Sequence, residues 1–120
     1  MSIFGRTPFE SFFAGYCEAL RFVDLKDEPV PSHARPKLKA LCRSFWEESR
    51  ALIEAEPSQD ERTAGIDFYY TQVGHGAGFW DGDWPMCGDA LTRRATDHGR
   101  VYASAEDGCV FVDVTQPAYA

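Results

Sequence analysis

The chain has 120 residues, 44% hydrophobic and 14% aromatic, which suffices for one core and leaves too little for a second domain. Its formal net charge of -7 argues against a general nucleic-acid binder, because neutralising phosphates requires clustered lysines and arginines. We therefore expect a single domain over residues 1–120, with a loose tail at about 115–120 and no direct nucleic-acid contact. Its acidity either keeps it in solution or attracts a basic partner.

The N-terminal segment lacks a cationic stretch followed by an apolar run, and no 18 consecutive residues are apolar. These features predict a cytoplasmic protein, inside the host cell, without a membrane partner. The cysteines form no C-x-x-C pair and have no histidine at zinc spacing, so we expect reduced, mostly buried thiols, no metal and no cofactor. They are Cys17, Cys42, Cys87 and Cys109.

A first helix is predicted from the segment TPFE to about Phe22. Thr7 can cap it, Pro8 suits the first helical position, and Glu10 completes a capping box. The apolar residues that follow recur at intervals of three and four, which predicts one core-facing side.

A second helix is predicted from about Pro36 to Ala55, after a proline-rich loop. Basic residues crowd its start and acidic residues its end, which opposes the helix macrodipole. A partner, a tertiary neighbour or chance would explain the basic start. Residues 47–61 form the most acidic stretch, with six acids and one arginine. The six are Glu47, Glu48, Glu54, Glu56, Asp60 and Glu61.

Strand-forming residues in the segment IDFYYTQ, residues 66–72, predict a β-strand that turns at Val73 and Gly74 and returns over residues 75–80. A third helix is predicted over about 87–98, ending before Gly99.

A second hairpin is then predicted, with strands at 101–103 and 110–114 and a turn at 106–108. Together these elements predict an α+β fold, in which a small antiparallel sheet of two hairpins packs against about three helices in the order α-α-β-β-α-β-β.

The segment GHGAGFWDGDW, residues 74–84, admits four interpretations. A phosphate cradle is disfavoured, because its glycines do not connect a strand to a helix N-terminus. Acid–base or metal chemistry would use His75 with Asp67 and Asp81, although no nucleophile or third metal ligand accompanies them.

The third interpretation is a recognition surface, anchored by Phe79, Trp80 and Trp84 and rimmed by Asp81 and Asp83. The fourth is packing alone, in which bare glycines let a helix approach one strand face while Phe79 and Trp80 fill the two sides of the sheet.

The longer segment AGIDFYYTQVGHGAGFWD, residues 64–81, resembles the signature of small proteins encoded by bacteriophages and mobile elements. That signature joins an AGxDFW strand through a short turn to GHGAGFWD, followed by a helix near Leu-Thr and a strand pair near Asp-Gly. Leu91-Thr92 and Asp107-Gly108 match this order, whereas Tyr69 replaces the usual Trp and Gln72-Val73 replace Arg-Asn. The resemblance implies a phage setting and assigns no catalytic residue.

Small acidic phage proteins commonly block a host machine, including CRISPR effectors, by occupying basic nucleic-acid channels as DNA mimics. We therefore expect a non-enzymatic, anti-CRISPR-like inhibitor whose partner is a host defence complex. Its expected partner-binding residues are Glu47, Glu48, Glu54, Glu56, Asp60, Glu61, Trp80, Asp81, Asp83 and Trp84. The alternatives are a small ligand-binding domain or enzyme using His75, Asp67 and Asp81, and a homodimer formed through the aromatic hairpin or the first helix.

Overall fold

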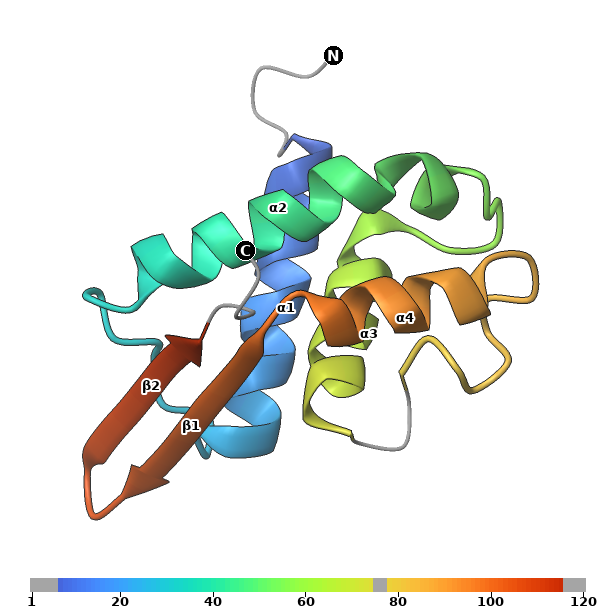
Figure 1. Ribbon diagram of the computed structural model, residues 1–120. Coiled ribbons are helices and arrows are strands. Elements are labelled where there is room, and N and C mark those ends of the chain that lie inside the picture. The colour runs from blue at the N-terminus through green and yellow to red at the C-terminus, as the bar shows by residue number, and fades with distance from the viewer. Residues whose placement is uncertain (1–6, 75–77, 116–120) are drawn as a thin grey trace.

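A computed structural model describes residues 7–74 and 78–115 of the chain, so the expected loose tail beyond 115 lies outside the described residues. The described part is an α+β arrangement of four helices followed by one antiparallel hairpin (Figure 1). None of these helices is both long and apolar enough to cross a membrane. The elements are α1 (Pro8–Asp24), α2 (Arg35–Glu54), α3 (Glu61–Val73), α4 (Gly88–Asp97), β1 (Arg100–Glu106) and β2 (Cys109–Thr115).

The predicted capping box at the start of α1 is confirmed. The Glu10 backbone N–H donates to the Thr7 hydroxyl at 3.1 Å, and the Thr7 backbone N–H donates to Glu10 Oε1 at 2.8 Å. Both of these N–H groups, which would otherwise lack a partner at the helix start, are thereby satisfied. The first helix therefore begins where the sequence predicts.

A tertiary neighbour accounts for part of the basic start of α2. The guanidinium carbon of Arg43 lies 3.8 Å from the ring centroid of Phe9, and that of Arg35 lies 5.3 Å from the centroid of Phe13. Cations over aromatic faces are attracted by the ring quadrupole, which offsets the unfavourable macrodipole at this helix end. The aromatic face of α1 thus provides partners for two of these basic residues, Arg35 and Arg43.

The first predicted hairpin is wrong, because residues 61–73 form helix α3. The Asp60 side chain accepts the Thr63 N–H at 2.8 Å and caps the helix, and Gly74 ends it in the left-handed region at φ 75°. Aromatic residues are accommodated in this helix because other elements pack against it. Phe68 and Tyr69 are buried, as is Ala64. Tertiary packing therefore overrides the strand propensity of IDFYYTQ.

Helices α1 and α3 cross so closely that their backbones touch. A Cβ atom added to Gly15 would overlap the carbonyl oxygen of Arg62, and one added to Gly65 would overlap that of Phe12. Both glycines are buried within helices, where glycine is otherwise unfavourable. Their role is to allow this close approach.

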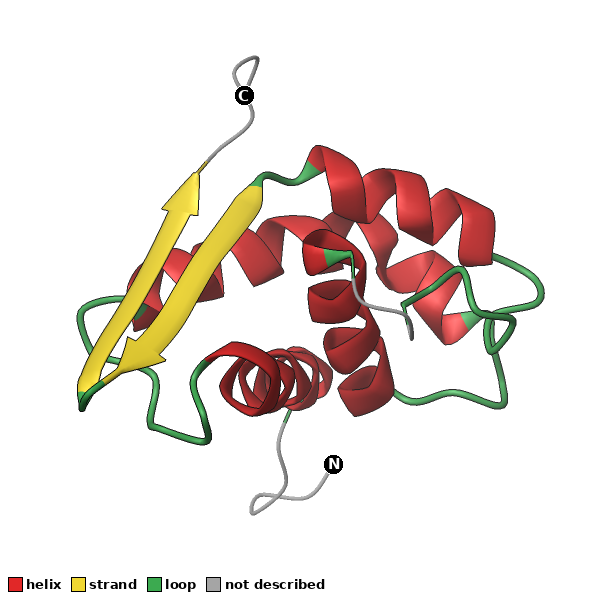
Figure 2. Ribbon diagram, turned by 90° about the horizontal axis from the view of Figure 1, so that it is seen from below, coloured by secondary structure: helices red, strands yellow, loops and turns green. Residues whose placement is uncertain are grey.

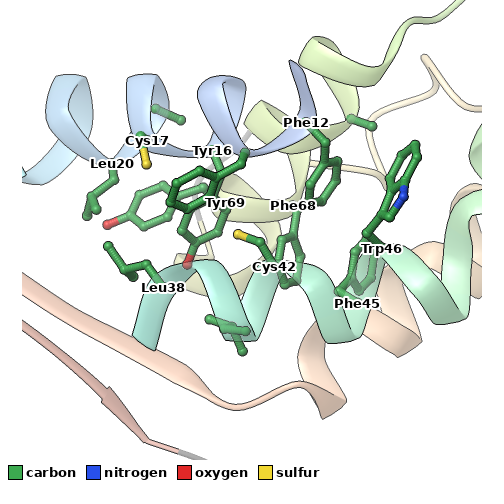
Figure 3. Packing of buried hydrophobic residues seen from close by; sticks show 14 of the residues in the cluster. Phe12, Tyr16, Cys17, Leu20, Leu38, Cys42, Phe45, Trp46, Phe68 and Tyr69 are labelled. Carbon is green, nitrogen blue, oxygen red and sulfur yellow. The ribbon is translucent and has the colours of Figure 1, made fainter. Parts of the chain in front are cut away.

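Aromatic rings from three helices fill the core at this crossing. Figure 3 shows Phe12 and Tyr16 from α1, Phe45 from α2, and Phe68 and Tyr69 from α3. Phe45 and Phe68 stack with centroids 4.0 Å apart. Cys17 and Cys42 are buried beside these rings, and burial raises the pKa of the Cys17 thiol to about 11, which keeps it protonated and inert.

The second predicted hairpin is confirmed, with a tight turn at Asp107 and Gly108. Both residues have positive φ, 50° and 80°, as a two-residue type I′ turn requires. The pairing runs from Arg100 opposite Thr115 to Glu106 opposite Cys109. Figure 2 shows the hairpin at one side of the helices.

One buried hydroxyl has no hydrogen-bond partner within the described residues, that of Ser49 on α2. Because an unsatisfied buried polar group costs about 1 kcal/mol or more, we expect Ser49→Ala to stabilise the protein by about 0.5–1 kcal/mol. Chemical denaturation of both proteins measures this change. A destabilised variant would mean that the hydroxyl has a partner, such as a buried water.

Candidate acidic interface

Two loops pack against each other at the end of the molecule opposite the hairpin: residues 55–60, which follow α2, and residues 78–87, which precede α4 (Figure 1). Gln59 Nε2 donates to the carbonyl oxygen of Asp83 at 2.8 Å. The Met86 backbone N–H donates to Glu56 Oε1 at 3.0 Å. These contacts join segments about 25–30 residues apart in the chain into one surface.

This surface concentrates negative charge. Residues 51–61 and 78–92 contain seven acids and no lysine or arginine. Five of the acids have exposed side chains, and we call them the acidic end of the molecule. They are Glu54, Asp60, Asp81, Asp83 and Asp89.

The exposed acids differ in their existing partners. Glu54 pairs with Arg50 one helical turn earlier, at 3.0 Å. Asp60 caps α3, and hydrogen bonding to Thr63 lowers the pKa of its carboxyl. Asp81 and Asp83 follow each other in an exposed turn, where Asp81 accepts the Asp83 N–H at 3.3 Å. Repulsion between these carboxylates makes the acidic end a favourable place for a basic partner.

Two predicted partner-binding residues are corrected by their burial. Trp84 is 2% exposed and Glu56 is 3% exposed, so neither side chain is available to a partner in this structure. The Trp84 ring packs edge-on against Phe79, with centroids 5.3 Å apart. Glu56 is turned inward because its carboxylate receives the Met86 N–H. Both side chains are buried beneath the acidic end and hold its loop in place, and neither faces a partner.

Two other apolar side chains are exposed at this end. Trp80 is 43% exposed, as the recognition-surface interpretation expects, and Met86 is 67% exposed. Sequence reasoning missed Met86, although its position in a polar loop beside Pro85 was a usable signal. An exposed tryptophan and methionine among carboxylates give this surface the apolar anchors that interfaces favour.

The remaining predicted acids lie along α2 and at the start of α3. Glu47 is exposed. Glu48 faces α4, where its carboxylate lies 3.1 Å from His98 Nε2 and 3.8 Å from Arg94 Nε. Glu61 is half-buried in the first turn of α3. Glu48 therefore joins two helices and does not belong to the acidic end.

A buried carboxylate supports the loop from below. Trp84 Nε1 donates to Asp67 Oδ2 at 2.6 Å, and Asp67 on α3 is 6% exposed. Burial, with smaller contributions from the charges of Asp81 and Asp83, raises the pKa of the Asp67 carboxyl to about 6. The Trp84 hydrogen bond acts in the opposite direction by favouring the charged form. Asp67 is thus an internal support for the Trp84 ring.

Helix α3 also holds the start of the loop. The Thr71 hydroxyl donates to the Asp67 carbonyl at 2.7 Å and accepts the Phe79 N–H at 3.0 Å. A Cβ on Gly78 would overlap this hydroxyl and the Trp80 ring. The packing interpretation is therefore correct that this glycine permits a close approach, but the approach is of loop to helix and no strand is involved.

The acid–base alternative combined His75, Asp67 and Asp81. His75 lies outside the described residues, Asp67 is buried and occupied by Trp84, and Asp81 is exposed. Within 7–74 and 78–115, no group of three or more His, Cys, Asp or Glu side chains is arranged to hold a metal ion. Of these three residues the structure thus describes two, and it places Asp67 beneath the loop and Asp81 on the exposed surface.

Comparison of the chain with protein-family models, with curated proteins and with solved structures gives no significant match. The resemblance of the GHGAGFWD segment to phage-encoded proteins consequently remains an expectation from the sequence.

Proposed function

We propose that this protein acts without catalysis, as an inhibitor that binds a basic surface of a nucleic-acid-handling protein through its acidic end. The proposal rests on one observation: two loops are joined by hydrogen bonds and form a single surface around exposed Trp80 and Met86. Both loops are rich in acids and contain no lysine or arginine. The phage-like signature in residues 64–81 suggests the setting, a host defence complex such as a CRISPR effector.

Physical complementarity supports this choice of partner. Basic channels that bind nucleic acid attract carboxylates at long range, and the attraction accelerates association more than it strengthens the final complex. Trp80 and Met86 would supply the apolar contacts that slow dissociation. The acids would therefore determine the association rate and its dependence on salt. The two apolar side chains would determine the dissociation rate.

The decisive variant is Asp81→Lys with Asp83→Lys. It reverses two exposed acids whose carboxylates form no hydrogen bond or ion pair with α2 or α3 among the described residues. We expect capture of the partner from host lysate, followed by surface plasmon resonance with the identified protein, to show at least about tenfold slower association at low salt. Its association rate should also depend less on ionic strength, because screening acts on the charges that were removed.

A control variant with the same change in net charge carries Glu28→Lys and Glu106→Lys, both exposed at the hairpin end. It should associate at nearly the wild-type rate. Equal slowing in both variants would attribute the effect to net charge alone, and wild-type rates in both would exclude the acidic end. Trp80→Ala with Met86→Ala should instead accelerate dissociation.

A further inference from the structure

A groove runs along strand β1, and Phe111 of β2 also contributes to its lining. It has a volume of about 370 Å³ and lies between β1 and the C-terminal ends of α1 and α3. The residues that form it include Asp24, Val73, Val101, Tyr102, Ala103 and Phe111. None of them belongs to the acidic end, which lies across the molecule (Figure 1).

The backbone of β1 has unused hydrogen-bonding groups along this groove. Because Asp107 and Gly108 form a two-residue turn, Glu106 and its partner Cys109 form a hydrogen-bonded pair, and every second residue pairs in the same way. The N–H and C=O groups of Val101 and Ala103 therefore point away from β2. Within the described residues, neither makes a hydrogen bond at that edge. This edge can pair with another extended chain.

The shape of the groove selects a slender occupant. Its far wall is made by Asp24 and Val73, at the ends of two helices that stand beyond the edge of β1. A second folded copy that offered its own β1 would bring the same helix ends into collision. The edge of β2, by contrast, lies at the outside of the molecule (Figures 1 and 2). A single extended segment suits the β1 groove, and a folded body does not.

The charge of the groove indicates what such a segment carries. Asp24 is its one charged lining residue within the described part of the chain, and its carboxylate takes a hydrogen bond from Tyr69, which leaves further acceptor positions. The C-terminal end of α3, whose last turn carries no basic residue, adds partial negative charge from its last carbonyl groups. Both features attract a lysine or arginine side chain.

Apolar contacts are available on the solvent side of the hairpin. Tyr102 is 52% exposed and Phe111 is 56% exposed. The register places Tyr102 opposite Asp113 and Phe111 opposite Ser104, so the two rings are diagonal neighbours on one face. An added strand would place its alternate side chains beside these rings.

We propose that the β1 edge binds an extended, basic peptide segment of a partner protein, which adds to the hairpin as a third strand beside Val101 and Ala103. Backbone pairing would give affinity, Asp24 would select a basic side chain, and Tyr102 with Phe111 would select apolar residues. This surface is separate from the acidic end, and the Asp81, Asp83 variant should leave it intact.

The test is selection of linear nonapeptides from a random display library on the full-length protein. We expect enriched sequences to alternate apolar residues with at least one lysine or arginine. A synthetic peptide of the enriched sequence should slow hydrogen exchange at the Val101 and Ala103 amides.

Ala103→Pro removes the edge N–H without removing a bond to β2 and should weaken peptide binding at least about tenfold. Asp24→Asn should weaken it about threefold to tenfold for a lysine peptide and leave a variant peptide lacking the lysine unaffected.

Two controls separate the edge from the overall fold. Glu28→Gln removes a nearby exposed carboxylate outside the groove and should not alter binding, and β2 resonances of Ala103→Pro should remain in place. If that variant unfolds, the Asp24→Asn comparison decides alone. Failure to enrich any sequence, equal binding by Ala103→Pro, or protection at Trp80 and Met86 would overturn the proposal. Binding that occurs only after removal of residues 116–120 would make the chain's own tail the occupant and would also overturn it.

Discussion

Gly65→Ala should destabilise the protein by about 3 kcal/mol or more, a large share of the stability of a domain of this size. The added methyl group would overlap the carbonyl oxygen of Phe12, which belongs to the backbone of α1 and cannot rotate away. The helices would have to separate, and the stacked rings of Phe45 and Phe68 would lose contact. Urea denaturation measures the loss as a lower midpoint.

Gly74→Ala is the matched control for this prediction. It makes the same chemical change at the end of the same helix, where no heavy atom of the described residues outside this helix end lies within 4 Å of the new methyl group. Its cost arises from the positive φ alone and should be about 1 kcal/mol. Equal losses in the two variants would show that α1 and α3 can move apart without penalty.

Asp67→Asn should increase stability at pH 7 relative to wild type, and the increase should vanish in acid. Burial raises the pKa of the Asp67 carboxyl from its ordinary value of 3.8 to about 6 in the folded protein, so the folded state binds the proton more tightly. The stability contributed by protonated Asp67 is complete below pH 3.8 and is lost as the pH rises through about 6. A shift of this size corresponds to about 2–3 kcal/mol at pH 7.

The measurement is the difference in unfolding free energy between the two proteins at several pH values from 3.5 to about 7.5. Asparagine keeps an oxygen that can accept the Trp84 N–H, so the comparison isolates the charge. Asp60→Asn provides a control of opposite sign, because the pKa of Asp60 is lowered and its contribution is lost as the pH falls. A pH-independent difference for Asp67→Asn would mean that water reaches this carboxylate.

The elements that the sequence predicted correctly have one face in the core and one in solvent. In α1, the capping box at Thr7 and the apolar spacing act within a few residues of each other, so both are visible in the sequence. The turn at Asp107 and Gly108 is equally local. Such signals do not depend on where the rest of the chain lies.

Helix α3 was mispredicted because it is buried on several sides and shows no simple alternation of apolar and polar residues. Ala64, Asp67 and Thr71 are buried along with the aromatic residues. Asp60 as a cap and Gly74 as a terminator were the local signals of a helix. The strand propensity of the residues between them outweighed these signals in the prediction.

The acidic end was predicted in part, since most of its carboxylates lie in the acidic stretch or beside Trp80. The burial of Trp84 was not predictable from its loop, because it depends on Asp67, 17 residues earlier on another element. The inward turn of Glu56 likewise depends on Met86, 30 residues later. Long-range pairings of this kind decide which loop residues face a partner.

The crossing at Gly15 and Gly65 also affects the order in which the protein can fold during synthesis. Gly65 is made 50 residues after Gly15 (65 − 15), so α1 and α2 are complete well before the helix that α1 packs against most extensively. Until α3 appears, the rings of Phe12 and Phe45 lack their partner Phe68 and remain open to other chains. During synthesis there is therefore an interval in which the aromatic surface of α1 and α2 is complete and exposed, because helix α3, which covers it in the folded protein, has not yet been translated.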